Sequence, residues 1–294
     1  MRTLAHLVAA SRPAVARFFG LADSRPQSRA TPAVPEPQTD SRTHTFILGD
    51  HSILFECPSK ISLQRAQWIL IKEPGTIAWI NAFAPGSVFW DIGANIGVFS
   101  LYAAVVRDCR VLAFEPTAPN YYGLNRNVVL NKLNERVHAY CVAIDRKCGL
   151  DDMQMRDDTI GTALHTFGKP IDYKGDTFNP AWRQGAVALS IDALVSQFGA
   201  PFPAHIKIDV DGLETAVIEG GRQTFSDPRF QSVLVEVNLD DEHEVAAVSN
   251  VLEAAGLRRD DEIPGNHERD VNGARIYNLV FSRPKAGKYG SATK

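Results

Sequence analysis

The sequence predicts an α/β fold in which a mostly parallel sheet carries helices on both faces. From residue 88 onward, short apolar segments alternate with segments of helical periodicity. An acidic, glycine-containing turn follows the first of these strands, at residues 91–97. The last two predicted strands have no helix between them. Two strands joined in this way can pair antiparallel, so we expect one reversed strand near the edge of the sheet.

The predicted elements before residue 88 are two short strands at 45–48 and 52–56 and two helices at 62–71 and 76–83. The later strands and helices alternate along the chain. Strands are predicted at 88–92, 110–114, 137–144, 206–210, 232–237, 257–263 and 276–282, and helices at 96–106, 119–132, 191–198, 213–224 and 241–255. The segment 145–188 is predicted to be irregular, and a loop of this length in a compact domain usually has a function, such as that of a lid.

Both ends of the chain differ in composition from its middle. Residues 1–22 lack acidic residues and carry three arginines among apolar residues. They are consistent with a poorly ordered tail, with a segment that touches a membrane surface or with a transit peptide. Residues 23–42 are proline-rich and predict a linker. We therefore expect a disordered tail and linker at 1–42, a hairpin and capping helices at 43–87, the main domain at 88–283 and a disordered tail at 284–294.

Charge and cysteine usage narrow the classes of partner and compartment. The formal net charge is −3, which does not favour a broad nucleic-acid surface, so we expect no nucleic-acid partner. No apolar run reaches the roughly 18 residues needed to cross a bilayer. The four cysteines have no C-x-x-C spacing and are expected to be small buried hydrophobes in a reducing compartment. We expect a cytoplasmic protein, with residues 1–22 as the segment for peripheral membrane contact.

The turn after the first core strand carries the clearest chemical signal. Gly93 allows a tight turn and the approach of the backbone to a ligand, and Gly97 lets the next helix pack closely. Asp91 places a negative charge at this turn. A glycine loop at a helix N-terminus suits pyrophosphate, an anion. The charge of Asp91 suits the ammonium and sulfonium of S-adenosylmethionine better.

The second core strand ends at Glu115, 18 residues after Gly97. An ionised carboxylate at this place can accept hydrogen bonds from both hydroxyls of a ribose. In open α/β sheets, ligands bind beyond the carboxyl ends of the strands at the switch point. Together with the glycine turn, Glu115 predicts an adenosine-type ligand, and the alternative is a solvated glutamate beside two packing glycines.

Four segments resemble FkbM-type methyltransferases of the class I S-adenosylmethionine-dependent superfamily. They are VFWDIGANIGVFS at 88–100, AFEP at 113–116, IKIDVDGLETAVIEGG at 206–221 and VEVN at 235–238. The resemblance covers roughly residues 60–282. It implies a Rossmann-like, seven-stranded, mostly parallel sheet whose last strand is antiparallel. It also implies methylation of an oxygen on a sugar, lipid or natural product, with S-adenosyl-L-methionine as the methyl donor.

The resemblance also implies roles for individual residues. The methionine part of the cofactor would be surrounded by Asp91, Gly93, Asn95 and Gly97, the ribose would be held by Glu115, the adenine would be flanked by Ala143, Ile144 and Asp145, and the methyl group would face Asp209. The sequence departs from the family at Asp211, where glutamate is common. A carboxylate one methylene shorter changes its reach toward a substrate or a helix cap.

A hydroxyl acceptor also needs a general base, and four residues are candidates: Asp209, Asp211, Glu214 and His165. Asp209 is best placed, at the end of a strand, although it could cap the following helix instead. Glu214 could complement the helix dipole, and His165 could be an ordinary exposed loop residue. Lys207 lies within an apolar strand and is expected to pair with a carboxylate.

Other functions have weaker support in the sequence. A dehydrogenase would need a third glycine at the turn and a Tyr-x-x-x-Lys pair, and neither is present. A non-catalytic protein that keeps the cofactor site remains an alternative. No metal site is expected, although Asp209, Asp211 and Glu236 could bind Mg²⁺ if they converge. The acceptor and the oligomeric state stay open.

Overall fold

A computed structural model describes residues 43–260, 269–271 and 273–284. The tail and linker predicted for 1–42, the membrane contact expected of residues 1–22 and nearly all of the tail predicted for 284–294 lie outside the described residues. No helix in the described part of the chain is long and apolar enough to cross a membrane.

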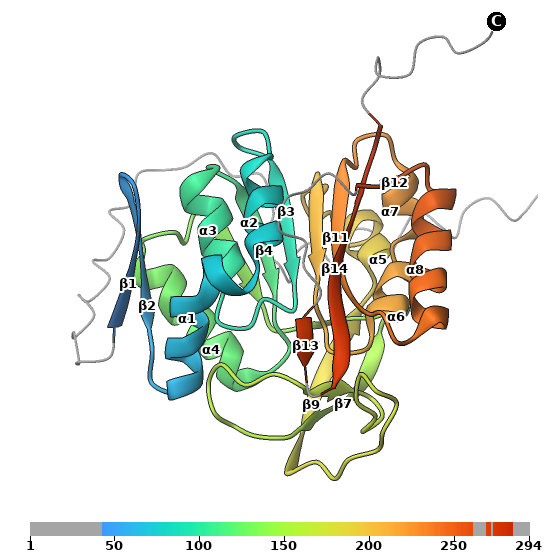
Figure 1. The fold of residues 1–294 in the computed structure, drawn as a ribbon, viewed down its shortest axis with the longest axis horizontal. Coiled ribbons are helices and arrows are strands. Elements are labelled where there is room, and N and C mark those ends of the chain that lie inside the picture. The colour runs from blue at the N-terminus through green and yellow to red at the C-terminus, as the bar shows by residue number, and fades with distance from the viewer. Residues whose placement is uncertain (1–42, 261–268, 272, 285–294) are drawn as a thin grey trace, which may run out of the picture. The chain divides into compact units, whose positions relative to one another are not determined.

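The described chain begins with two strands and two helices, after which strands and helices mostly alternate, apart from a run of successive strands in the middle of the chain (Figure 1). In chain order they are β1 (Thr43–Leu48), β2 (His51–Glu56), α1 (Lys60–Lys72), α2 (Pro74–Asn81), β3 (Val88–Ile92), α3 (Val98–Val106), β4 (Arg110–Phe114), α4 (Ala118–Leu130), β5 (Val137–Tyr140), β6 (Ala143–Ile144), β7 (Gly149–Met155), β8 (Thr166–Phe167), β9 (Trp182–Leu189), α5 (Ile191–Ser196), β10 (His205–Ile208), α6 (Glu214–Glu219), α7 (Arg222–Ser226), β11 (Ser232–Asn238), α8 (Glu242–Ala254), β12 (Arg258–Arg259), β13 (Arg269–Val271) and β14 (Ala274–Ser282).

The main sheet has the predicted mixed topology. Within the described residues its strands lie in the order β12-β14-β11-β10-β3-β4-β5, and the short strand β13 pairs with β14 beside this path. The strands from β11 to β5 are parallel to one another. β14 pairs antiparallel with β11 and with β12. The seven-stranded, mostly parallel sheet with a reversed last strand is therefore confirmed, and β13 is an addition to it.

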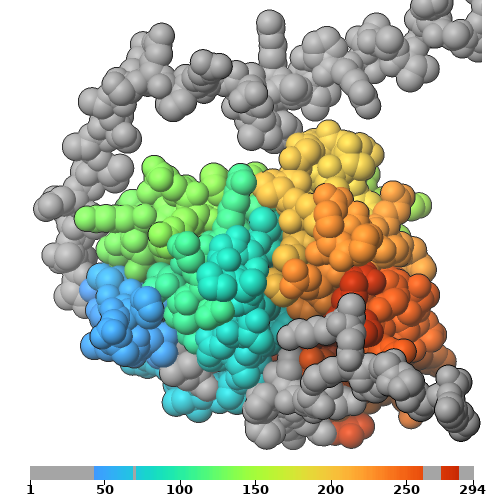
Figure 2. All heavy atoms as spheres, turned by 90° about the horizontal axis from the view of Figure 1, so that it is seen from above, coloured from blue at the N-terminus to red at the C-terminus, as the bar shows by residue number. Residues whose placement is uncertain are grey.

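Alternating side chains of the strands fill two cores, one on each face of the sheet. On β3, Phe89 points into the core that contains α2 and α3. Trp90 and Ile92 point into the core on the other side, which contains residues of α5 to α8. This two-residue period is that of a strand buried on both faces. In Figure 2, the hairpin β1–β2 (blue) and the α8 region (orange and red) lie at opposite edges of this domain.

The N-terminal hairpin attaches to the domain through Asn127 of α4 and Asn131 at the C-cap of that helix. The backbone N–H of Glu56 donates to Asn127 Oδ1 at 2.7 Å. Asn131 Oδ1 accepts from Leu54 N, and Asn131 Nδ2 donates to Leu54 O. The side-chain amides thus satisfy backbone groups at the edge of β2, which would otherwise need a neighbouring strand.

One predicted helix is divided in the structure. Residues 213–224 form α6 and α7, which are separated at Gly220 and Gly221. A Cβ on Gly220 would lie 2.5 Å from the carbonyl oxygen of Asp145, so this position needs glycine. Asp192 on α5 accepts hydrogen bonds from the backbone N–H groups of Gln223 and Thr224. These contacts satisfy the N-terminus of a new helix, which stabilises the break.

The segment 145–188, which was predicted to be an irregular loop, instead contains most of a second sheet. Its strands lie in the order β6-β9-β7-β8. β7 and β9 pair antiparallel from Gly149↔Ala188 to Met155↔Trp182. The predicted strand 137–144 also divides, because β5 joins the main sheet and β6 pairs with β9. The charged residues within β7 hide the strand pattern from the sequence.

Two of the cysteines also differ from expectation. Cys57 and Cys109 are buried, as predicted, whereas Cys141 and Cys148 are exposed. Both exposed residues lie near β6, in the region where the chain leaves the main sheet for the second sheet.

An aromatic cluster surrounds His205 beneath the main sheet. The imidazole of His205 stacks on Phe83 with ring centroids 3.8 Å apart, and Trp79 packs edge-on against both rings. His205 Nδ1 lies 2.8 Å from Ser232 Oγ, and its Nε2 is buried without a partner in the described structure. Burial lowers the pKa of His205 from 6.5 to about 3.

This pKa makes folding pH-dependent. The unfolded state binds a proton below about pH 6.5, whereas the folded state binds it only near pH 3, so acid favours unfolding. We expect His205 to reduce the free energy of unfolding by about 1.4 kcal/mol per pH unit within this range. Urea unfolding at pH 7 and pH 4.5 should show a smaller acid-induced loss in His205→Gln than in the wild type. His243→Gln, which changes an exposed histidine, should keep the full loss, and equal losses in all three proteins would contradict the prediction.

Candidate functional site

The glycine turn joins the ends of three neighbouring strands. Gly93 has a φ of +81°, and a Cβ at this position would lie 1.8 Å from the carbonyl oxygen of Asp209. The backbone N–H groups of Gly93 and Ala94 donate to the carbonyl of Phe114. The close approach that requires glycine is therefore made to the backbone after β10, rather than to a ligand as the sequence suggested. The turn brings the carboxyl ends of β3, β4 and β10 together.

Two predicted cofactor residues lie beneath this turn. A Cβ on Gly97 would lie 2.4 Å from Leu124 Cδ1, so the absence of a side chain lets α3 pack against α4. Asp91 is 1% exposed, and its Oδ2 accepts a hydrogen bond of 2.6 Å from Ser100 Oγ. Neither residue lines the pocket above the turn. Asp145 is likewise outside its lining.

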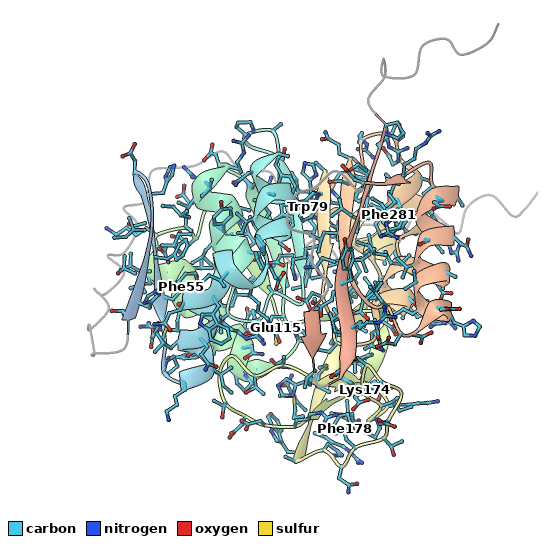
Figure 3. All side chains as sticks on the ribbon, in the orientation of Figure 1. Phe55, Trp79, Glu115, Lys174, Phe178 and Phe281 are labelled. Atoms are coloured by element: carbon cyan, nitrogen blue, oxygen red, sulfur yellow. The ribbon has the colours of Figure 1, made fainter. Side chains whose placement is uncertain are left out.

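A pocket of about 690 Å³, partly open to solvent, lies at the switch point of the sheet, where β3 has β4 on one side and β10 on the other. We call it the switch-point pocket. Of the residues singled out from the sequence, its lining contains Gly93, Asn95, Glu115, Ala143, Ile144, His165, Asp209 and Asp211. Figure 3 shows Glu115 between the main sheet and the segment 145–188, which carries Lys174 and Phe178.

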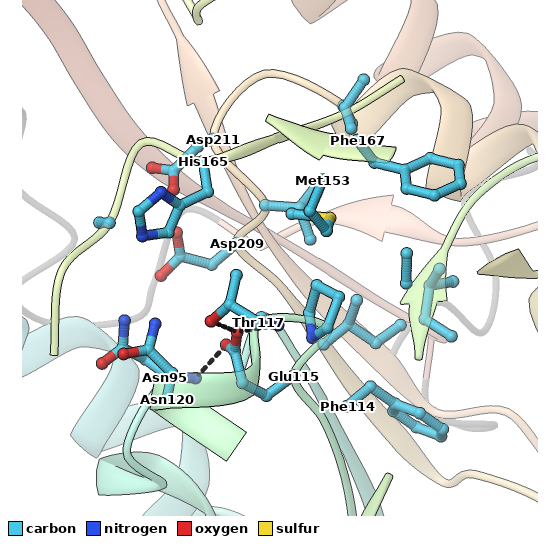
Figure 4. Close-up of a pocket in the computed structure, with 18 of the residues that line it drawn as sticks. Asn95, Phe114, Glu115, Thr117, Asn120, Met153, His165, Phe167, Asp209 and Asp211 are labelled. Carbon is cyan, nitrogen blue, oxygen red and sulfur yellow. Dashed lines mark hydrogen bonds between the residues drawn. The ribbon is translucent and has the colours of Figure 1, made fainter. Parts of the chain in front are cut away.

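Glu115 is held in the pocket wall by its neighbours. Its Oε2 accepts from the backbone N–H of Asn95 at 2.9 Å. Its Oε1 accepts from the backbone N–H and the hydroxyl of Thr117. Burial raises the pKa of Glu115, and the hydrogen bonds from Thr117 and Asn95 act against this rise. Figure 4 shows these three residues on one side of the pocket and Asp209, Asp211 and His165 on the other.

Residues 159–165, which we call the strap, cross over the pocket. The strap is the part of the predicted lid that contacts the turn region. It is anchored to side chains of other elements: Ile160 O accepts from Ser59 Oγ, Gly161 O from Arg65 Nε, and Thr162 O from Asn95 and Asn120, while Gly161 N donates to Asn120 and Leu164 N to Asp211. These hydrogen bonds fix the position of the strap above the pocket.

Lys207 meets carboxylates, as the sequence predicted. The residue is 1% exposed, and its Nζ lies 2.6 Å from Asp209 Oδ2. It stands opposite Asp91 in the register of β10 and β3. Burial alone would lower the pKa of Lys207, but the charges of Asp209, Glu73 and Asp91 raise it. Burial raises the pKa of Asp91, and the charge of Lys207 acts against this rise.

Asp211 lies at the boundary of the pocket in a left-handed backbone conformation, with a φ of +58°. Aspartate tolerates this conformation better than most residues. Its Oδ2 accepts a hydrogen bond of 2.7 Å from Leu164 N in the strap. Burial and the charge of Asp209 raise the pKa of Asp211 to about 6. A carboxylate with this pKa can exchange a proton near neutral pH.

Glu214 holds the loop between β10 and α6. It is buried, and it accepts hydrogen bonds of 3.0 Å from the backbone N–H groups of Val210 and Gly212. Burial, followed by the charge of Glu244, raises the pKa of Glu214 well above its usual range. Glu214 does not line the switch-point pocket. These contacts give it a role in shaping the loop that carries Asp209 and Asp211.

His165 is buried rather than exposed, which corrects the interpretation of it as a solvent-facing loop residue. It is 7% exposed and lines the pocket. Its Nδ1 accepts a hydrogen bond from the backbone N–H of Arg156 at 3.1 Å. Burial lowers its pKa. In the neutral imidazole the proton is therefore on Nε2, which makes that nitrogen a donor and not a base.

A second pocket of about 850 Å³ adjoins the first, and we call it the acidic pocket. Both pockets are lined by Arg65, Ala163, Asp209 and Asp211. Glu236 also lines the acidic pocket, beside Asp209 and Asp211. The described residues nevertheless contain no group of three or more histidine, cysteine or acidic side chains that could hold a metal ion. The Mg²⁺ alternative therefore has no support in the geometry.

Sequence reasoning missed several residues of the switch-point pocket, including Arg65, Thr117, Asn120, Met153 and Phe167. Thr117 is the one with a local signal, because it lies two residues after Glu115 and just before α4. The others come from α1, α4, β7 and β8, whose places beside the turn are set by tertiary packing.

The Lys207 ammonium should be important for stability. Lys207→Met would leave the buried carboxylate of Asp91 and that of Asp209 without their cation, which we expect to cost about 3–5 kcal/mol. Chemical denaturation measures this loss. Lys147→Met, at an exposed position, should change stability by less than about 0.5 kcal/mol. A loss in Lys207→Met as small as in this control would show that the two carboxylates do not depend on the ammonium.

Comparison with known proteins agrees with this geometry. A family model described as the methyltransferase FkbM domain matches residues 91–259, more than half of the chain. A search of curated proteins found no match.

Solved structures also resemble the chain. The methyltransferase FkbM from Methylobacillus flagellatus KT is 14% identical, with 75% of this chain and 51% of that chain covered and a TM-score of 0.48. The chain thus spans about half the length of that protein. The tRNA methyltransferase TrmK of B. subtilis is 14% identical, with 73% and 68% covered and a TM-score of 0.42. TYW2 of P. horikoshii, in complex with MeSAdo, is 13% identical, with 83% and 73% covered and a TM-score of 0.38. Likenesses of this strength carry no argument about function.

Proposed function

The chain belongs to the FkbM methyltransferase family, and on this premise we propose that it transfers the methyl group of S-adenosylmethionine to a hydroxyl oxygen of a sugar, lipid or small natural product. One observation carries the proposal. The turn at Gly93 and the carboxylate of Glu115 line one pocket, and Asp209 and Asp211 line that pocket and the acidic pocket next to it. A methyl donor in the first pocket and an acceptor in the second would meet at these two aspartates.

The lining of the switch-point pocket fits the proposed cofactor. Glu115 would accept hydrogen bonds from the ribose hydroxyls, and the apolar side chains of Phe114, Ala143 and Met153 would contact the adenine. The turn at Gly93 and Asn95 would hold the methionine part. The carboxylates on the far wall suit the positive charges of the sulfonium and ammonium. When bound, S-adenosylmethionine supplies an already activated methyl group.

The protein must align the acceptor and accept its proton, and Asp211 is the better of two candidates for this base. Asp209 already pairs with Lys207. Asp211 has a pKa raised to about 6 by burial and by the charge of Asp209, which suits a base that works near neutral pH. Asp209 would then pair with Lys207 and keep the pKa of Asp211 raised through its negative charge. His165 would donate through Nε2, and Glu214 would support the loop.

The family and the acidic pocket both support a proposal for the acceptor class. The carboxylates that line this pocket disfavour a polyphosphate backbone, so we propose a small-molecule or glycan acceptor rather than a nucleic acid. A cytoplasmic location, with a peripheral membrane contact through residues 1–22, completes the proposal.

Glu115→Ala tests the cofactor assignment. We expect the wild type to bind S-adenosylhomocysteine and the variant to bind it at least about tenfold more weakly, because hydrogen bonds to a charged group are lost. Isothermal titration measures both affinities. Glu135→Ala removes an exposed carboxylate and should leave the affinity unchanged. Full affinity in Glu115→Ala would remove the ribose assignment, and a wild type that does not bind would refute the cofactor.

Asp211→Asn tests the base. Loss of a general base should lower turnover by about 10²–10⁴-fold, which is far more than the change in affinity for S-adenosylhomocysteine. Wild-type turnover should rise with pH through about 6, because only the ionised carboxylate of Asp211 accepts a proton. Mass spectrometry of a cell extract incubated with the protein and methyl-labelled cofactor gives the readout. Asp209→Asn should lower turnover less than Asp211→Asn does, because Asp209 pairs with Lys207 and is not the base. Unchanged turnover in Asp211→Asn would assign the base elsewhere.

A further inference from the structure

The switch-point pocket is lined by more acidic than basic residues, although the proposed cofactor carries a carboxylate. Glu115, Asp209 and Asp211 contribute three carboxyl groups to the lining. Arg65 is the one lysine or arginine among the described residues that line it. The methionine part of S-adenosylmethionine ends in a carboxylate of its own. Without a nearby cation, this group would be repelled by the acidic wall.

Arg65 lies where the pockets meet. It is half-buried on α1 and lines the switch-point pocket, the acidic pocket and a groove beside Trp68 and Phe99. Its Nε donates to the carbonyl of Gly161 in the strap. This bond fixes the direction of the guanidinium plane.

The rest of the guanidinium is available for a ligand. None of the described carboxylates forms an ion pair with Arg65, and its terminal nitrogens make no hydrogen bond within the described structure. Several other described arginines do form ion pairs, among them Arg126, Arg136, Arg146, Arg156, Arg229 and Arg275. A guanidinium has five N–H donors in a fixed fork, and that fork matches the two oxygens of a carboxylate.

We propose that Arg65 binds the carboxylate of the methionine part of the cofactor. The proposal rests on the proposed function, since it assumes S-adenosylmethionine in the switch-point pocket. A fork-to-fork contact of this kind sets orientation as well as affinity. It would fix the amino-acid end of the cofactor and thereby the position of the sulfur and its methyl group.

The proposal gives the N-terminal helix a part in the site. Arg65 lies before residues 91–259, the segment that matches the family model. α1 is held in place by the capping box of Ser59 and Ser62 at its start, by the buried side chain of Ala66 and by its bonds to the strap. The methyl donor would therefore be held by the core domain at its ribose and by α1 at its carboxylate.

Two ligands separate this contact from the rest of the site. S-adenosylhomocysteine carries the amino-acid carboxylate, and 5′-methylthioadenosine lacks the whole amino-acid end. We expect Arg65→Ala to bind S-adenosylhomocysteine at least about tenfold more weakly than the wild type in isothermal titration. The variant should bind 5′-methylthioadenosine as tightly as the wild type does. Arg65→Lys, which keeps the charge without the fork, should give an intermediate affinity for S-adenosylhomocysteine.

Arg156→Ala is the matched control. Arg156 Nε also donates to a carbonyl of the strap, that of Leu164, but Arg156 does not line the switch-point pocket. This variant should lose affinity for neither ligand, or lose it equally for both. Thermal unfolding of each variant checks that the protein is folded.

The remaining outcomes overturn the proposal in distinguishable ways. If Arg65→Ala binds both ligands as the wild type does, Arg65 does not contact the carboxylate. If Arg65→Ala lowers the affinity for both ligands equally, Arg65 acts on the pocket through the strap. If the wild type binds neither ligand, the proposed function fails and this inference fails with it.

Discussion

The site depends on the contact between the backbone at Gly93 and the backbone after β10. The carbonyl oxygen of Asp209 occupies the space of a Cβ on Gly93. Because β3 and β10 are neighbours in the sheet, this contact sets how far each strand continues before its chain turns away. It also places Asp209 and Asp211 over the turn, opposite Glu115. A larger residue at position 93 would separate the two loops and open the pocket that they form.

The charges around this contact form one connected group. Lys207 is the buried cation between Asp91, below the turn, and Asp209, at the pocket. Asp91 therefore acts on the site through Lys207 and the sheet, although it does not line the pocket. Burial and Asp209 raise the pKa of Asp211, and Glu214 holds the backbone between the two aspartates and α6. The pocket has an acidic wall whose protonation depends on burial more than on any single partner.

Residues 145–188, which follow β6, partly cover the open carboxyl edge of the main sheet. In an open α/β sheet the carboxyl ends of the strands face solvent, so residues from elsewhere must cover a ligand. Here β7 and β8 of the second sheet contribute Met153 and Phe167, and the strap contributes Thr162 and His165. The strap is bonded to α1, to α4 and to the loop after β10. The strap is thus fixed to elements that themselves contribute residues to the pocket lining.

Local sequence patterns were enough to predict several parts of this protein. The alternation of strands and helices, the reversed β14, the pairing of Lys207 with a carboxylate and the presence of Glu115 beside the glycine turn all follow from periodicity, from strand ends or from the cost of burying a charge.

Which of these residues reach the pocket depends on tertiary packing. Asp91 and Gly97 belong to the same motif as Gly93, yet they pack beneath the turn, because a strand sends alternate side chains to opposite faces and a helix start is set by its packing partner. Arg65 and His165 enter the site from α1 and the strap, far from the motif in sequence. The physical reason is that contacts between residues far apart in sequence depend on how whole helices and strands pack together. A local pattern of residues does not contain this information.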